Sequence, residues 1–249
     1  MHWLNAVMWA QLALGAAALA GLAYDPRQLL GVSVWLKPLK FEISVFVFLL
    51  TVREMIRLYP AGFRPGEQVA KAVAAAMAVE IALINLQAWR GVTSHFNHTT
   101  WFDARVFNVM GLLIVLNTVA VVRLAWLYWR SPPPAPSAGL LAGIRWGLVL
   151  MLAGSLQAGA MLSRMAHTVG APDGSPGLPL VNWSLTSGDL RVAHAVGLHG
   201  LQALPLAGWL VDRARLARPA RVVALIAVLY TALFAALLWQ ALSGRPLLG

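Results

Sequence analysis

Val222–Trp239 reads VVALIAVLYTALFAALLW, a continuous apolar run without a charged side chain. A helix that crosses the roughly 30 Å hydrocarbon core of a membrane needs about 20 mostly apolar residues, because each residue adds about 1.5 Å. Unbroken Ala, Leu and Val runs are typical of such helices, whereas strands of a membrane barrel alternate polar and apolar residues. Seven predicted spans have this character: 3–23, 39–58, 69–90, 105–128, 142–167, 190–211 and 219–242.

The predicted fold is an all-α integral membrane protein, a single seven-helix transmembrane domain over residues 1–249. Of these residues 59% are apolar and 11% charged, against about 25% charged residues in soluble domains. This composition excludes an ordinary water-soluble globule and a disordered chain. The chain has no cysteine, which excludes disulfides, thiolate catalysis, c-type haem attachment and iron–sulfur clusters.

The positions of Lys and Arg predict which side of the membrane each loop faces. The net charge of +10 is carried by basic residues that stand singly between apolar runs, so it indicates topology and not nucleic-acid binding. Twelve of the 19 basic residues fall at the span ends that we assign to the inner side and seven at those that we assign to the outer side. We therefore expect the N-terminus outside and the C-terminus inside. The Arg-rich, Ala-rich and Lys-poor usage suggests a multi-pass protein of the bacterial cytoplasmic (inner) membrane, with the lipid bilayer as its partner.

Polar side chains gather at the predicted outer ends of the spans. All six histidines fall there, and polar groups at membrane depth are costly unless they face a bundle interior or a wet cavity. We expect an outward-facing polar cavity. Its arginines suit an anionic group, such as a lipid headgroup or a small anionic ligand, because the guanidinium fork binds oxyanions. The predicted substrate-binding residues are Arg90, Arg105, Arg164, Arg191 and Gln202.

The histidines predict a metal or haem site. The candidate ligands are His95, His98, His167, His194 and His199. The i,i+3 spacing of His95 and His98 lets both share a helical face, whereas the i,i+5 spacing of His194 and His199 is poor for one ion. Imidazole with carboxylate suits a transition metal (Zn, Cu or Fe), and paired imidazoles can hold haem. The alternative is that these histidines form structural hydrogen bonds between helices.

Three carboxylates are candidate catalytic or proton-carrying groups: Asp103, Glu42 and Glu80. Asp103 follows the histidine-containing stretch between two spans, and Glu42 directly precedes a long apolar run. Glu80 lies near the centre of a span, where a charged carboxylate costs about 2.5–3.5 kcal/mol. We expect Glu80 to be protonated or paired. It could relay protons, or it could simply bond a neighbour such as Asn117 or Gln11.

The predicted outer loop Gly170–Asp189 is rich in proline and glycine. Loops of this length are often lids or binding loops, and a plain connector is the alternative. Asp189 directly precedes the span 190–211, so we interpret it as an N-cap.

Three stretches carry a resemblance to known proteins. KPLKFEIS (37–44), RGVTSHFN (90–97) and GDLRVAHAVGLHGLQALPL (188–206) resemble an uncharacterised family of bacterial seven-span membrane proteins. This resemblance covers most of the bundle and implies no activity. A weaker analogy is to the seven-helix zinc hydrolases of the alkaline ceramidase and adiponectin-receptor type. Their SxxxH, Asp and HxxxH pattern is similar to Ser94–His98, Asp103 and the pair His194 and His199, although the last pair has one residue too many between the histidines.

Three functions follow as hypotheses. The first is a metal- or haem-dependent enzyme that acts on an amphipathic or anionic substrate at the outer leaflet, where a zinc-bound water would reach a pKa near 7. The second is a transporter or receptor-like binding protein for a small anionic molecule, with Glu80 as a coupling proton site. The third is a structural or assembly protein of the membrane.

Overall fold

The structure is a computed structural model that describes residues 1–248, and 71% of the chain is helical. Seven long helices run through the described residues: α1 (His2–Tyr24), α2 (Leu36–Arg57), α3 (Arg64–Trp89), α4 (Trp101–Arg130), α5 (Ala138–Arg164), α6 (Leu190–Arg213) and α7 (Pro219–Leu242). Four two-residue strands pair as β1 (Gln28–Leu29) with β2 (Val32–Ser33) and β3 (Thr168–Val169) with β4 (Gly188–Asp189).

The all-α prediction is confirmed, and each predicted span coincides with one helix to within a few residues. Five helices are long and apolar enough to cross a membrane, namely α1, α3, α4, α5 and α7. The chain is thus consistent with a helical membrane protein. The two other helices, α2 and α6, are as long but are not among these five.

The contacts divide the chain into two compact units. The first unit comprises Met1–Arg57 and Ala61–Ala120, and the second comprises Leu58–Pro60 and Val121–Gly249. The helix α4 continues through the boundary at Ala120. That the whole chain forms one seven-helix domain stays a prediction.

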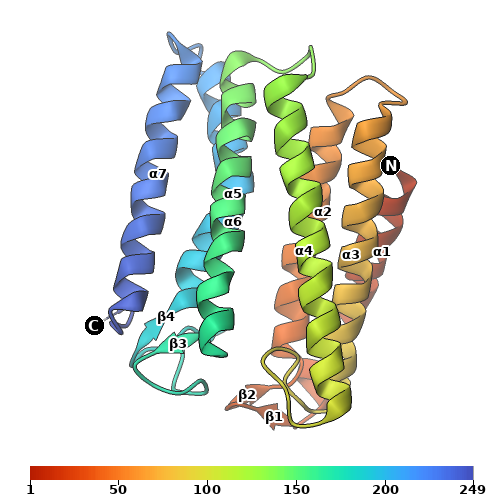
Figure 1. Cartoon of the computed structure of the whole chain (residues 1–249), viewed down its shortest axis with the longest axis vertical. Helices are drawn as coiled ribbons and strands as arrows, with labels where there is room; N and C mark the ends of the chain where they lie inside the picture. The colour runs from red at the N-terminus through yellow and green to blue at the C-terminus, as the bar shows by residue number, and fades with distance from the viewer. Residues whose placement is uncertain (249) are drawn as a thin grey trace. The chain divides into compact units, whose positions relative to one another are not determined.

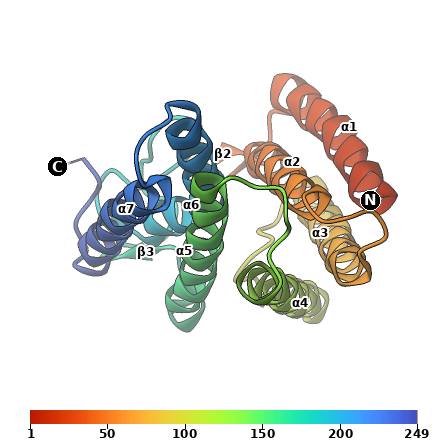
Figure 2. The ribbon, with the colours of Figure 1, turned by 90° about the horizontal axis from the view of Figure 1, so that it is seen from above.

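In the first unit, α1, α2 and α3 pack side by side (Figures 1 and 2). The stripe of α1 that faces inward is Leu4, Met8, Gln11 and Ala18, which recurs every three to four residues as one helical face does. The β1–β2 hairpin joins α1 to α2. Its turn residues Leu30 and Gly31 both have positive φ, 51° and 78°, as expected for a two-residue turn that matches the twist of the strands.

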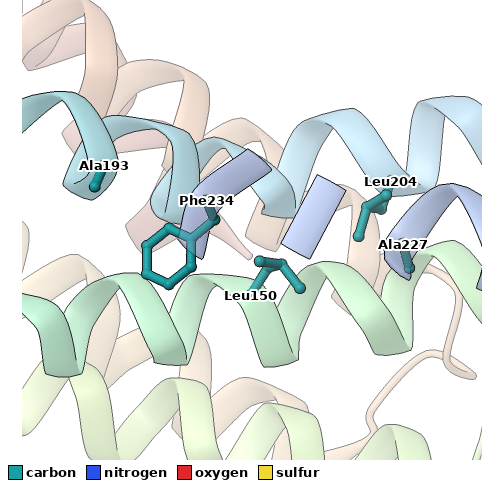
Figure 3. Close-up of a cluster of buried hydrophobic side chains, with 5 residues drawn as sticks. All are labelled: Leu150, Ala193, Leu204, Ala227 and Phe234. Atoms are coloured by element: carbon teal, nitrogen blue, oxygen red, sulfur yellow. The ribbon is translucent and has the colours of Figure 1, made fainter. Parts of the chain in front are cut away.

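In the second unit, α5 and α6 pack most closely, and α7 covers both (Figure 1). Glycines allow this approach: a Cβ on Gly154 would lie 2.9 Å from the carbonyl carbon of Gly197. Between the three helices lies a cluster of buried apolar side chains, Leu150, Ala193, Leu204, Ala227 and Phe234 (Figure 3). The strands β3 and β4 close the base of the loop that joins α5 to α6.

Candidate functional site

Two carboxyl groups lie inside the three-helix bundle of the first unit. Glu42 on α2 is 1% exposed and Glu80 on α3 is 2% exposed. The Nδ2 of Asn85 donates a hydrogen bond to Glu42 Oε1 over 2.9 Å. Within the described residues, the second oxygen of Glu42 and the Oε2 of Glu80 have no hydrogen-bond partner. A buried polar atom without a partner is expensive, so these oxygens need an explanation.

The three helices of this bundle each contribute one such residue. On α1, Gln11 is 2% exposed, and its Oε1 also lacks a partner in the part of the chain that the structure describes. Gly15 stands one turn from Gln11, and a Cβ there would lie 3.9 Å from Glu42 Oε2. The bare backbone of α1 at Gly15 therefore leaves room beside the Glu42 carboxyl.

These groups follow one another along the bundle axis. The Asn85–Glu42 bond fixes the level of α3 against α2. Glu80 comes five residues before Asn85, about 7 Å deeper along the helix at about 1.5 Å per residue. Gln11 comes four residues before Gly15 on α1, about 6 Å deeper than the contact with Glu42. Buried polar side chains thus extend from the hairpin end of the first unit toward the middle of its helices.

At the hairpin end, the polar series begins with Lys37 and His95. The Lys37 Nζ lies 3.1 Å from His95 Nδ1, and the hydroxyl of Ser94 lies at the same distance from that nitrogen. The ring of Phe41 lies 5.9 Å from that of His95. The half-buried Lys37 and His95 side chains thus lie between the loop end and the buried carboxyls.

Asp103 has a different surrounding. It is 1% exposed at the start of α4 and forms an ion pair with Arg90. It also accepts hydrogen bonds from Gln87 Nε2 (2.9 Å) and Thr100 Oγ1 (2.6 Å). The backbone N–H of Asp103 donates back to Thr100 Oγ1 over 3.1 Å, which closes a reciprocal helix cap. Asp103 ties the end of α3 to the beginning of α4.

The predicted arginines lie at separate places. In the first unit, Arg90 pairs with Asp103 and Arg105 stacks on Trp101, with the guanidinium carbon 3.9 Å from the ring centre. In the second unit, Arg164 donates to the carbonyl of Ala160. Arg191 pairs with Asp189 over 2.6 Å.

Each predicted histidine ligand has its own local partner or position. In the first unit, His95 contacts Lys37 and Ser94, and the exposed His98 packs edge-on against Phe107 at 5.4 Å. In the second unit, three further histidines have three different partners: His167 with Asp173 at 2.5 Å, His194 with the Gly154 carbonyl at 2.9 Å, and the exposed His199 with Gln202 at 3.3 Å. Over residues 1–248, no three His, Asp or Glu side chains are grouped so that they could hold a metal ion. The metal or haem centre stays a prediction.

The loop between α5 and α6 is held together by two aspartates. Asp173 accepts hydrogen bonds from the N–H groups of His167 and Thr168 and from the Thr168 hydroxyl. Asp189 is the N-cap of α6 and accepts from Arg191 N over 3.0 Å, which confirms the capping interpretation. It also accepts from Ser184 N at 2.8 Å. The segment is thus a folded connection with its own hydrogen-bond network.

Sequence reasoning identified Glu42 and Glu80 but missed Asn85, and it considered Gln11 only as a neighbour of Glu80. A signal for both was present. Gln11 lies on the same inward stripe of α1 as Met8 and Ala18, and Asn85 is an amide within an apolar span.

No family model, curated protein or solved structure matches this chain.

Proposed function

We propose that this chain is a polytopic membrane protein that transports or binds a small anionic molecule together with protons, and that Glu42 and Glu80 are its proton-binding groups. The observation that carries the proposal is the pair of buried carboxyls on adjacent helices, each with an oxygen that no described residue bonds. The function belongs to the first unit alone.

The buried positions of Glu42 and Glu80 make a negative charge on either side chain costly. An ionised carboxylate in an apolar environment is strongly disfavoured unless it is paired, so such a group takes up a proton instead. Glu42 has an amide donor in Asn85 and no cation within its described hydrogen bonds. A proton on each carboxyl removes the charge that burial disfavours. The bundle would then bind these protons and exchange them with the solvent.

The hairpin end supplies the second half of the proposal. Lys37 lies against His95, with the two side-chain nitrogens 3.1 Å apart. Imidazole is the side chain whose unperturbed pKa allows proton exchange near neutral pH. A lysine beside it attracts an anion. We therefore assign anion entry and proton exchange to this end, in agreement with the transporter hypothesis.

The topology belongs to the same proposal. Seven spans with the N-terminus outside would place the hairpin end, which lies one span after the N-terminus, on the inner side of the bacterial cytoplasmic membrane. The bias of basic residues toward the opposite ends of the helices instead favours the hairpin end on the outer side, which requires the N-terminus inside and the C-terminus outside. We therefore propose this reversed orientation in place of the predicted one. The polar residues of α2 explain why that helix falls outside the five most apolar ones, since a helix that lines a polar interior is not uniformly hydrophobic.

The direct test is proton binding by the purified full-length protein. Infrared difference spectra between acidic and alkaline pH should show protonated carboxyl bands that disappear in Glu80→Gln and in Glu42→Gln. The matched control is Glu67→Gln, because Glu67 lies on α3 as well but is exposed at its first turn. Bands that persist unchanged in both inner variants would contradict the proposal.

Proton movement is tested in proteoliposomes that contain a pH-sensitive dye and carry an imposed pH gradient. The wild-type protein should dissipate the gradient faster than protein-free vesicles, and Glu80→Gln should abolish the difference while Glu67→Gln preserves it. Stoichiometric metal or a haem absorption band in protein purified without a histidine tag would instead favour the predicted metal- or haem-dependent enzyme.

A further inference from the structure

Arginines gather at one end of the second unit, opposite the β3–β4 end. Here α4 ends, α5 begins, α6 ends and α7 begins (Figure 1). Hydrogen bonds define this arrangement: Asp212 on α6 accepts from backbone N–H groups in the first turn of α5, and Arg145 on α5 donates to the carbonyl of Tyr128 on α4 over 3.0 Å. Seven arginines lie at this end: Arg123, Arg130, Arg145, Arg213, Arg215, Arg218 and Arg221.

Negative charge does not balance them. Among the described residues of this end, Asp212 is the single carboxylate. It accepts from the backbone N–H groups of Gly139 and Leu140 and from the Ser137 hydroxyl, so it serves as the cap of α5. No ion pair joins any of the seven arginines to a carboxylate in residues 1–248. Six of the seven are exposed, Arg145 being half-buried.

Aromatic rings accompany the guanidinium groups. Arg213 lies 5.2 Å from the ring centre of Trp209, Arg123 lies 5.4 Å from Trp126, and Arg145 lies 5.0 Å from Trp129. Tryptophan favours the level of the lipid headgroups. A cation held over its ring therefore stands where the phosphates of a bilayer lie, and this holds at three points around the second unit.

We propose that this arginine end of the second unit binds the phosphodiester headgroups of anionic phospholipids. Guanidinium binds phosphate through paired hydrogen bonds, and clustered basic residues at the end of membrane helices attract anionic lipid. Charge complementarity selects this occupant over a zwitterionic lipid, which carries no net negative charge. The proposal does not depend on the proton-binding function of the first unit.

The test uses the purified full chain in a neutral detergent and measures its thermal unfolding midpoint. Cardiolipin or phosphatidylglycerol should raise the midpoint by a few degrees, while phosphatidylcholine at the same molar ratio and sodium phosphate alone should not. The triple variant R213Q/R218Q/R221Q should lose at least half of this shift. The matched control is Arg245→Gln, which removes an arginine stacked on Trp239 at the other end of α7 and should keep the full shift.

Three results would overturn the proposal: an equal shift with phosphatidylcholine, a full shift in the triple variant, or a shift reproduced by phosphate alone. If the triple variant does not fold, the salt dependence of the wild-type shift decides. Exposed charges are screened by salt, so the lipid-induced shift should shrink as sodium chloride is raised. A salt-independent shift would equally overturn the proposal.

Discussion

The same chemical group occurs in two states in this protein. Asp25 and Asp173, both in loops, are surrounded by donors: Asp25 by Arg27 and Trp35, and Asp173 by His167 and Thr168. The Asp25 bonds to Arg27 and Trp35 hold its pKa well below the ordinary value. For Asp173, burial alone would raise the pKa, but the bonds from His167 and Thr168 outweigh it and lower the pKa. The loop carboxylates are therefore structural anions, in contrast to Glu42 and Glu80, for which we propose a bound proton.

The lowered pKa of Asp173 predicts a pH dependence of stability. A depressed folded-state pKa contributes stability above the unfolded value of about 3.9, and this contribution is lost as the pH falls below it. Asp173→Asn should lower the free energy of unfolding at pH 7 by about 1–3 kcal/mol. It should also flatten the fall in the thermal unfolding midpoint between pH 5 and pH 3. If the unfolding midpoint of Asp173→Asn fell as steeply between pH 5 and pH 3 as that of the wild type, Asp173 would not be the source of this pH dependence. Glu67→Gln serves as the control.

For Glu42, we expect that replacing the carboxyl group with an amide does not destabilise the protein, in contrast to Asp173. If its carboxyl is already neutral in the folded protein, Glu42→Gln keeps the hydrogen bond from Asn85 and removes no charge. Its thermal unfolding midpoint at pH 7 should equal or exceed that of the wild type. Glu42→Ala should lower stability by about 1–3 kcal/mol, because Asn85 loses a buried partner. A Gln variant as unstable as the Ala variant would show that the ionised form is needed.

The sequence is sufficient to flag a carboxyl such as Glu80, because its position in an apolar span already makes it costly. The sequence alone does not show which side chains lie around such a carboxyl. That Asn85 reaches Glu42, or that Gly15 leaves room beside it, depends on the register between helices. Side-chain pattern predicts which face is buried, but two faces can slide past one another by a turn without changing that pattern.

At the level of the elements, all seven helices were predictable from apolar runs alone. Pro219–Leu242 matches its predicted span, and the other boundaries shift by a few residues because helix ends include polar interface residues such as Trp101 and Arg130. What could not be predicted is the close contact of α5 with α6. In lipid, helices associate through small residues that let backbones approach, yet glycines that face lipid look the same in the sequence.

Two glycines of α5 show the difference between a glycine at the contact with α6 and a glycine without a close neighbour. A Cβ on Gly143 would collide with the backbone carbonyl of Leu204 on α6, whereas a Cβ on Gly159 meets no described atom within 4 Å. Gly143→Ala should therefore lower the free energy of unfolding by about 1–3 kcal/mol through overpacking. Gly159→Ala should be neutral or stabilise the helix by up to about 1 kcal/mol. Both are measured by thermal unfolding in one detergent, and equal effects would argue against the close α5–α6 contact.

At the scale of the whole molecule, the prediction of one histidine-lined cavity depended on drawing residues from both halves of the chain. The structure instead describes two units, with His95 and His98 in the first and His167, His194 and His199 in the second. Each histidine has local contacts inside its own unit. A linear sequence shows only that all of them fall at predicted outer ends, and sharing a membrane side is a weaker condition than sharing a site.

The absence of cysteine makes the topology directly measurable. Single cysteines at exposed Gln28 and Ala61 flank α2, and at exposed Thr186 and Ala217 they flank α6. If the N-terminus is inside and all seven helices span the membrane, a membrane-impermeant maleimide should label Gln28→Cys and Thr186→Cys in intact cells. It should label Ala61→Cys and Ala217→Cys only after the membrane is opened. A reversed pattern would invert the orientation that the arginine distribution predicts. Labelling of both members of a pair from one side would mean that α2 or α6 does not cross, and the first unit would then have no continuous bundle around Glu42.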